Sequence, residues 1–304
     1  MAKKLSNRFV GEVFFCTSIF ILAALFTVYF SVSAHAAVKK TSILGSGGKT
    51  VCRVDLDGDG TKEKLEIQIS YDEYEAFFSN VCFLVDGKEV LSYDDLDINQ
   101  VTADYIALDE SNIFLRIVTN SDNDYVITDR FYVYDRSRQK LSEVAKLLEE
   151  QYHITNSWAE VKSVTDSKIL INYQMQFDEI GKVKWTSAYV LKEGKLRLKS
   201  NTMHAKSTLA GTMTINEDPY GSLFQKNQFQ AMRKIRFYKN TDLKQLSYTA
   251  NPKDILKLTK LKYVQDYFYV QFSKGNKTGW MKLGQAGVEN PSGFFYGVAS
   301  RLAG

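Results

Sequence analysis

A short acidic stretch near residue 60 carries the residue types best suited to chemistry. Asp55, Asp57 and Asp59 occupy alternate positions, and a glycine follows each of the last two. Carboxylates spaced in this way converge when a loop coils around a cation, and hard oxygen ligands at this density suit Ca²⁺. Gly60 gives the backbone the freedom that such a turn needs. The spacing therefore predicts a calcium loop.

The residues around this stretch decide which ligands complete the site. The string also satisfies the helix-loop-helix calcium pattern, with Glu66 in its last position. The flanking sequences alternate like strands, however, so we expect Glu66 to point away from the loop. We therefore predict Glu63 as the last carboxylate and the Thr61 carbonyl as a further ligand. The alternative is an acidic turn that binds nothing tightly, because Asp and Gly are ordinary turn residues.

Most of the chain shows the period-two alternation of apolar and polar residues that is typical of strands. Asp86-Gly87 and Glu193-Gly194 each separate two such runs and predict tight hairpins. One stretch differs, because its apolar residues have helical spacing. These residues are Leu141, Val144, Ala145, Leu148 and Tyr152. We therefore expect a mainly β fold whose first domain is an antiparallel sandwich-like or propeller-like sheet structure with one helix.

The first 36 residues are expected to be a secretory signal peptide. Lys3, Lys4 and Arg8 precede an apolar run over residues 13–34, and Ala34 and Ala36 form a cleavage site. The alternative is an uncleaved membrane anchor, because about 20 apolar residues can span a bilayer. Either outcome places the remaining chain in a secreted or cell-surface location.

Export changes the interpretation of the two cysteines that remain, Cys52 and Cys82. In an oxidising compartment they could form a disulfide, which would stabilise the chain by about 3 kcal/mol. The alternative is a pair of buried free thiols, which are also common.

Charge is segregated along the chain. Residues 71–130 carry a net charge of −11, whereas residues 225–304 carry +10. Such asymmetry indicates two domains with different partners. We predict a β-rich domain over residues 37–200, a polar linker over 201–232 and a small all-β barrel over 233–304.

Two resemblances add to this picture. The acidic segment 54–63 resembles the calcium loops of FG-GAP-like and β-propeller-like repeats, in a chain that resembles a type of uncharacterised exported protein of clostridia and their relatives. Residues 235–239, 254–258, 269–272 and 279–282 resemble a bacterial Src-homology-3-like domain. Such barrels commonly bind cell-wall glycopeptide (peptidoglycan) or proline-rich peptides, so that resemblance implies binding at the cell envelope. Tyr267, Tyr269 and Trp280 are the candidate ligand-binding residues, and the basic charge would attract anionic wall polymer.

Nothing in the sequence indicates an enzyme. His153 and His204 have no nucleophile motif near them, and the chain contains no Walker loop, zinc-protease motif or dinucleotide fingerprint. We therefore expect a non-catalytic, calcium-supported protein of the cell envelope that binds no nucleic acid. Two alternatives stay open: an envelope hydrolase or hydrolase accessory with acidic catalysts such as Asp94 or Asp109, and a membrane-anchored sensor ectodomain.

Overall fold

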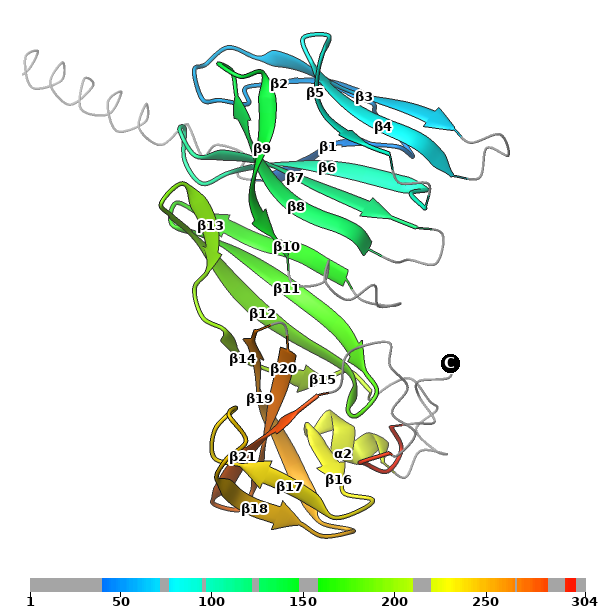
Figure 1. Ribbon diagram of the computed structural model, residues 1–304, viewed down its shortest axis with the longest axis vertical. Coiled ribbons are helices and arrows are strands. Elements are labelled where there is room, and N and C mark those ends of the chain that lie inside the picture. Colours follow the sequence, from blue (N-terminus) through cyan, green and yellow to red (C-terminus); the bar gives the residue numbers. More distant parts are fainter. Residues whose placement is uncertain are drawn as a thin grey trace, which may run out of the picture. The chain divides into compact units, whose positions relative to one another are not determined.

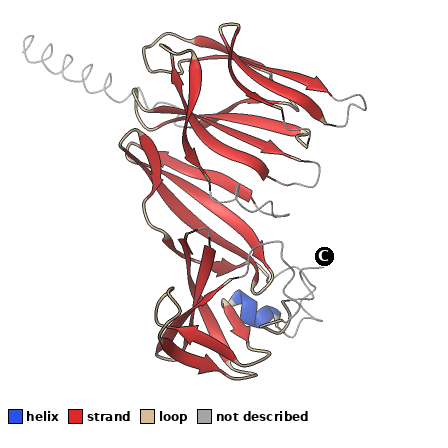
Figure 2. Ribbon diagram, viewed as in Figure 1, coloured by secondary structure: helices blue, strands red, loops and turns tan. Residues whose placement is uncertain are grey.

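The computed structural model describes residues 40–71, 77–94, 97–121, 126–147, 158–209, 220–265, 267–283 and 293–298 of the 304-residue chain. The expected signal peptide, residues 1–36, lies outside this part. In the described residues, no helix is long and apolar enough to cross a membrane. The protein is mainly β, as the alternation predicts, and strands dominate the ribbon (Figure 2).

In the part of the chain that the structure describes, the strands form four antiparallel sheets, which we name A to D (Figure 1). Sheet A has the order β1-β6-β7-β8-β9 and contains β1 (Lys40–Gly45), β6 (Gln100–Ala107), β7 (Ile113–Asn120), β8 (Val126–Asp135) and β9 (Lys140–Lys146). Sheet B has the order β2-β3-β4-β5 and contains β2 (Val51–Val54), β3 (Glu63–Tyr71), β4 (Phe78–Val85) and β5 (Lys88–Tyr93).

The later part of the chain forms sheets C and D. Sheet C contains β10 (Trp158–Thr165), β11 (Lys168–Phe177), β12 (Gly181–Lys192) and β13 (Lys195–Leu198) in sequential order, with β15 (Lys206–Ser207) on β12. Sheet D has the order β14-β19-β20-β21-β17-β18, with β16 on β19. Its strands are β14 (Thr202–His204), β16 (Gln228–Gln230), β17 (Ile235–Tyr238), β18 (Leu246–Ala250), β19 (Ile255–Val264), β20 (Tyr267–Lys274) and β21 (Lys277–Lys282).

Both predicted hairpins are confirmed. Asp86 and Gly87 connect β4 to β5 with φ values of 49° and 80°. Glu193 and Gly194 connect β12 to β13 with φ values of 54° and 71°. Two central residues at positive φ match the twist of the flanking strands, which is why these dipeptides favour two-residue hairpins.

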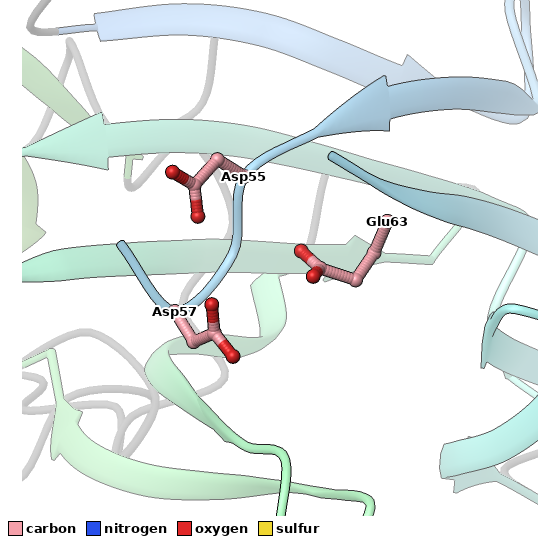
Figure 3. A group of neighbouring side chains, drawn as sticks. All are labelled: Asp55, Asp57 and Glu63. Atoms are coloured by element: carbon pink, nitrogen blue, oxygen red, sulfur yellow. The ribbon is translucent and has the colours of Figure 1, made fainter. Parts of the chain in front are cut away.

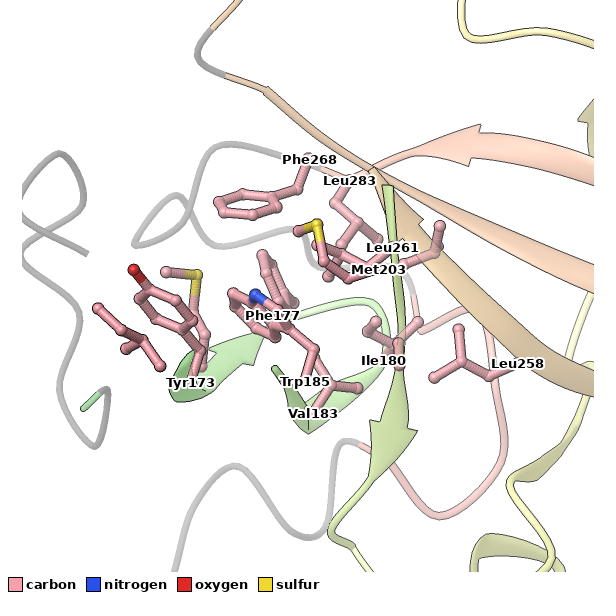
Figure 4. Close-up of a cluster of buried hydrophobic side chains, with 14 of the residues drawn as sticks. Tyr173, Phe177, Ile180, Val183, Trp185, Met203, Leu258, Leu261, Phe268 and Leu283 are labelled. Carbon is pink, nitrogen blue, oxygen red and sulfur yellow. The ribbon is translucent and has the colours of Figure 1, made fainter. Parts of the chain in front are cut away.

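Sheet A has a hydrophobic core on each of its faces. One core combines residues of sheets A and B, including Leu65, Phe83 and Leu115, so these two sheets form a sandwich-like pair. The other core combines residues of sheets A, C and D, including Phe114 from β7. Figure 4 shows its later part, where Trp185 and neighbouring side chains from sheet C meet side chains of sheet D. Strands such as β7 therefore carry apolar residues on consecutive positions.

The predicted helix is wrong over residues 140–146, which form β9. Leu141 belongs to the core between sheets A and B, whereas Val144 belongs to the opposite core. Residues an odd number of positions apart lie on opposite faces of a strand, so a sheet buried on both faces can imitate helical spacing. Leu148 and Tyr152 lie outside the described residues. The helix that the structure does describe is α2 (Gly221–Gln225).

The stretch expected to be a linker, residues 201–232, contributes to the fold. It contains β14, β15, α2 and β16, and its side chains Met203, Phe224 and Phe229 are buried. The strands described over residues 233–304 are antiparallel, but strand pairing does not close sheet D into a barrel among the described residues. Among the described residues, sheets B and C are sequential four-strand meanders and sheet A contains another over β6 to β9, whereas sheet D has a different strand order. Neither the Src-homology-3-like barrel nor the propeller-like arrangement is confirmed.

The predicted disulfide is not present, because Cys52 and Cys82 are free thiols. Cys52 lies opposite Leu65, which lies opposite Val85, so all three side chains share the core face of sheet B. Cys82 is three residues from Val85 in β4 and faces the other way, where its thiol contacts Asn80. A bridge requires the two Cβ atoms to face each other, which this register forbids.

Candidate functional sites

The acidic loop connects β2 to β3, and pairing between these strands closes it. Val54 lies opposite Glu63, so the first and last carboxylates of the loop lie near each other. One carboxylate oxygen from each of Asp55, Asp57 and Glu63 lies within 4.8 Å of the other two, as Figure 3 shows for the three side chains. Three of the four predicted carboxylates therefore converge, and Asp59 is not part of this group. Glu63 is the buried member, with 3% of its surface exposed.

Asp55 holds the backbone of the loop. Its two carboxylate oxygens accept hydrogen bonds from the amides of Gly58 at 2.7 Å and Gly60 at 2.9 Å. Both glycines have positive φ, at 79° and 85°. The Asp59 carboxylate accepts a hydrogen bond from the Thr61 amide at 2.7 Å, whereas the role predicted for Thr61 is through its carbonyl oxygen. Much of the loop's hydrogen-bonding capacity is thus used internally.

Arg136 lies among the remaining carboxylates. This residue comes from the turn between β8 and β9, and its Nε atom is 2.7 Å from Asp57 Oδ2. Its two terminal nitrogens form ion pairs with Asp59 and Glu63. Sequence reasoning missed Arg136, because an arginine in a turn more than 70 positions away carries no local signal. The cluster is therefore centred on an arginine.

The electrostatics of the cluster agree with this arrangement. A hydrogen bond from the Thr61 amide lowers the pKa of Asp59, and the charge of Arg136 lowers it further. The hydrogen bond to Glu63 raises the pKa of Arg136. The Leu56 amide donates to the other oxygen of Glu63 at 2.8 Å, which satisfies this buried carboxylate. These carboxylates suit Ca²⁺ chemically, but a guanidinium group neutralises them already.

Tyr267 and Tyr269, two of the predicted ligand-binding residues, share one face of sheet D with lysines. Tyr269 lies directly opposite both Lys262 and Lys282 in neighbouring strands, so the three side chains point the same way. Tyr267 is two positions earlier on the same face and is 42% exposed. The Lys282 ammonium is 3.1 Å from its ring centroid. We call Tyr267, Tyr269, Lys262 and Lys282 the tyrosine–lysine face.

Trp280 does not offer a similar surface. It lies opposite Gln271 and Tyr238 in sheet D, but only 9% of it is exposed. Stacking on a ligand needs an open ring face, so the binding role predicted for Trp280 is not supported by its burial.

Two carboxylates considered as hydrolase catalysts have local partners. The Asp109 carboxylate accepts hydrogen bonds from the backbone of Ser111 and from the backbone and side chain of Asn112. This pattern is that of a side chain that caps its own turn. Asp94 accepts a hydrogen bond from the Asn80 side chain. Both carboxylates therefore accept hydrogen bonds from residues near them.

Comparisons with protein-family models, with curated proteins and with solved structures find no match to this chain.

Proposed function

We propose that this protein is an exported, non-catalytic protein of the cell envelope that binds anionic wall polymer through the tyrosine–lysine face. The observation that carries this proposal is the placement of two partly open tyrosine rings beside two lysines on one face of sheet D. Aromatic rings stack on apolar faces of a ligand, and ammonium groups attract its anions. The local roles of Asp94 and Asp109 support the absence of catalysis.

Wall binding should depend on this face. The double substitution Tyr267→Ala and Lys282→Ala removes both an aromatic surface and a cation, so we expect retention on purified cell walls to fall about tenfold. High salt should release the wild-type protein, because it screens contacts between exposed charges. Co-sedimentation with purified walls over a range of protein concentrations measures both effects.

The matched control is Lys253→Ala, which removes one exposed lysine from the turn before β19, at the opposite end of that strand from Lys262. Its retention should equal that of the wild type. Equal loss in both variants would show that only net charge matters and would contradict the proposed site. Release of reducing ends from the walls would favour the hydrolase alternative.

Calcium support of the acidic loop is part of the same proposal, and Arg136 makes it testable. The guanidinium group competes with a cation for Asp57, Asp59 and Glu63. Replacing it by glutamine should therefore expose the site to calcium. With a dissociation constant typical of extracellular modules, 5 mM calcium would stabilise Arg136→Gln by about 1–2 kcal/mol, which corresponds to a melting temperature about 2–4 °C higher.

Thermal unfolding of Arg136→Gln in calcium and in chelator measures this effect, and the wild type should shift less. Adding Asp57→Ala to the variant removes a ligand and should abolish the calcium response. If neither the wild type nor Arg136→Gln responds to calcium, the loop is a structural element held by arginine alone.

A further inference from the structure

The outer face of sheet C is strongly basic. Strand alternation places residues such as Ile171, Tyr173 and Trp185 in the core, and the intervening residues on the opposite face. Strands β10 to β13 and β15 contain eight basic residues and one acidic residue, Glu160. The hydrophobic core lies on the other face of the sheet, so packing of the core does not explain this excess of basic residues.

A depression of about 590 Å³ lies on this basic face. Its volume is within the range of small-molecule sites. The lining includes an exposed aromatic ring, amides and ammonium groups, namely Trp158, Asn172, Gln174, Lys162, Lys184 and Lys206, and His204 of β14 also contributes to it. Among the residues that the structure describes, no acidic side chain contributes to the lining. The composition is therefore that of a site for a polar anion with an apolar surface.

The register of the strands explains how these groups meet. Trp158 of β10 lies directly opposite Gln174 of β11, and Lys184 of β12 lies opposite Lys206 of β15. Like charges directly opposite each other destabilise a sheet, because their repulsion is not offset. Among the described residues, neither lysine has an ion pair. A bound anion would remove this repulsion.

Two further features fit a sugar ring. Trp158 is 41% exposed, so a large part of its indole is open to a ligand. The Thr186 hydroxyl donates to Asn172 Oδ1 at 2.8 Å, which fixes that amide and leaves its NH₂ group to donate. A pyranose has apolar faces for stacking and hydroxyls for hydrogen bonding, and an acidic pyranose adds the anion.

We propose that this depression is a second binding site, separate from the tyrosine–lysine face, for an acidic sugar. The pyranose ring stacks on Trp158, Asn172 and Gln174 bind its hydroxyls, and Lys184 and Lys206 bind its carboxylate or phosphate. The site is formed by different strands from those of the tyrosine–lysine face, so it can exist whether or not that face binds walls.

Isothermal titration of the purified protein at low salt tests the site. The probes are trigalacturonic acid, its methyl ester, glucose 6-phosphate and a thymidine oligonucleotide. We expect trigalacturonic acid to bind at least tenfold more tightly than its uncharged ester. Trp158→Ala and Lys184→Gln should each weaken binding about tenfold. Lys192→Gln removes an exposed lysine from the same strand outside the depression and should leave binding unchanged.

Each outcome of the titrations either supports or overturns the proposed sugar site. Binding of glucose 6-phosphate with the same dependence on Trp158 and Lys184 supports the site and identifies phosphate as the preferred anion. No binding of either acidic sugar, or equal binding of the ester, overturns it. So does oligonucleotide binding as tight as sugar binding, which would indicate a general polyanion surface. Failure of the wall experiment on Tyr267→Ala/Lys282→Ala leaves this result unaffected, so the two proposals fail separately.

Discussion

Replacing Arg116 by methionine should lower the free energy of unfolding by about 3–5 kcal/mol, because it leaves a buried carboxylate without its cation. Arg116 Nε and Nη2 bind the two oxygens of Asp129 at 2.8 and 2.6 Å. The exposed fractions of the two side chains are 5% and 1%. Burial raises the pKa of Asp129, and the charge of Arg116 opposes this rise. Urea denaturation measures the loss.

Replacing the other member of the pair, Asp129→Leu, should lower the free energy of unfolding by less. Arg116 would keep Asp104, whose carboxylate lies 3.7 Å from Nη1 and is 16% exposed, as a partial counter-charge. The double variant Arg116→Met/Asp129→Leu removes both buried charges and should recover most of the stability. Losses that simply add in the double variant would contradict the view that the two groups stabilise the fold only as a pair.

Arg116→Met should also weaken binding at the proposed sugar site. Arg116 Nη2 donates to the Ala159 carbonyl at 2.9 Å and so ties sheet A to β10. Ala159 directly follows Trp158, the stacking residue of the depression. We therefore expect Arg116→Met to weaken trigalacturonate binding even at temperatures where the protein stays folded.

The second large effect is expected for Gly58→Ala in the acidic loop. A Cβ atom at this position would lie 2.2 Å from the Glu110 carbonyl oxygen, a backbone atom that cannot rotate away. The φ value of 79° adds a penalty for any residue with a side chain. Steric overlap and backbone strain together should lower the free energy of unfolding by about 2–4 kcal/mol.

Gly60→Ala is the matched control for this prediction. Gly60 has a similar φ of 85°, but no atom of the described residues lies within 4 Å of the position of its Cβ. Its substitution should therefore cost only the backbone term, about 1 kcal/mol. Urea denaturation of the two variants separates the contributions. Equal losses would mean that the loop is not packed against the turn at Glu110 in solution.

Local interactions explain why part of the fold could be predicted. Alternating residues such as 65–69 form strands because the two faces of a strand meet different environments, and Asp86-Gly87 forms a hairpin because its residues tolerate positive φ. The carboxylates of Asp55, Asp57 and Glu63 converge for a local reason too. They lie within nine residues of one another, and the pairing of β2 with β3 closes the loop that carries them.

Strand content, tight turns and the acidic loop could be predicted from the sequence, because each depends on neighbours along the chain. The entry of Arg136 into that loop, the opposite orientations of Cys52 and Cys82, and the separate cores of Leu141 and Val144 depend instead on long-range contacts. The physical reason is that these outcomes follow from strand register and from the stacking of sheets. Both join residues far apart in sequence, and no short pattern encodes them.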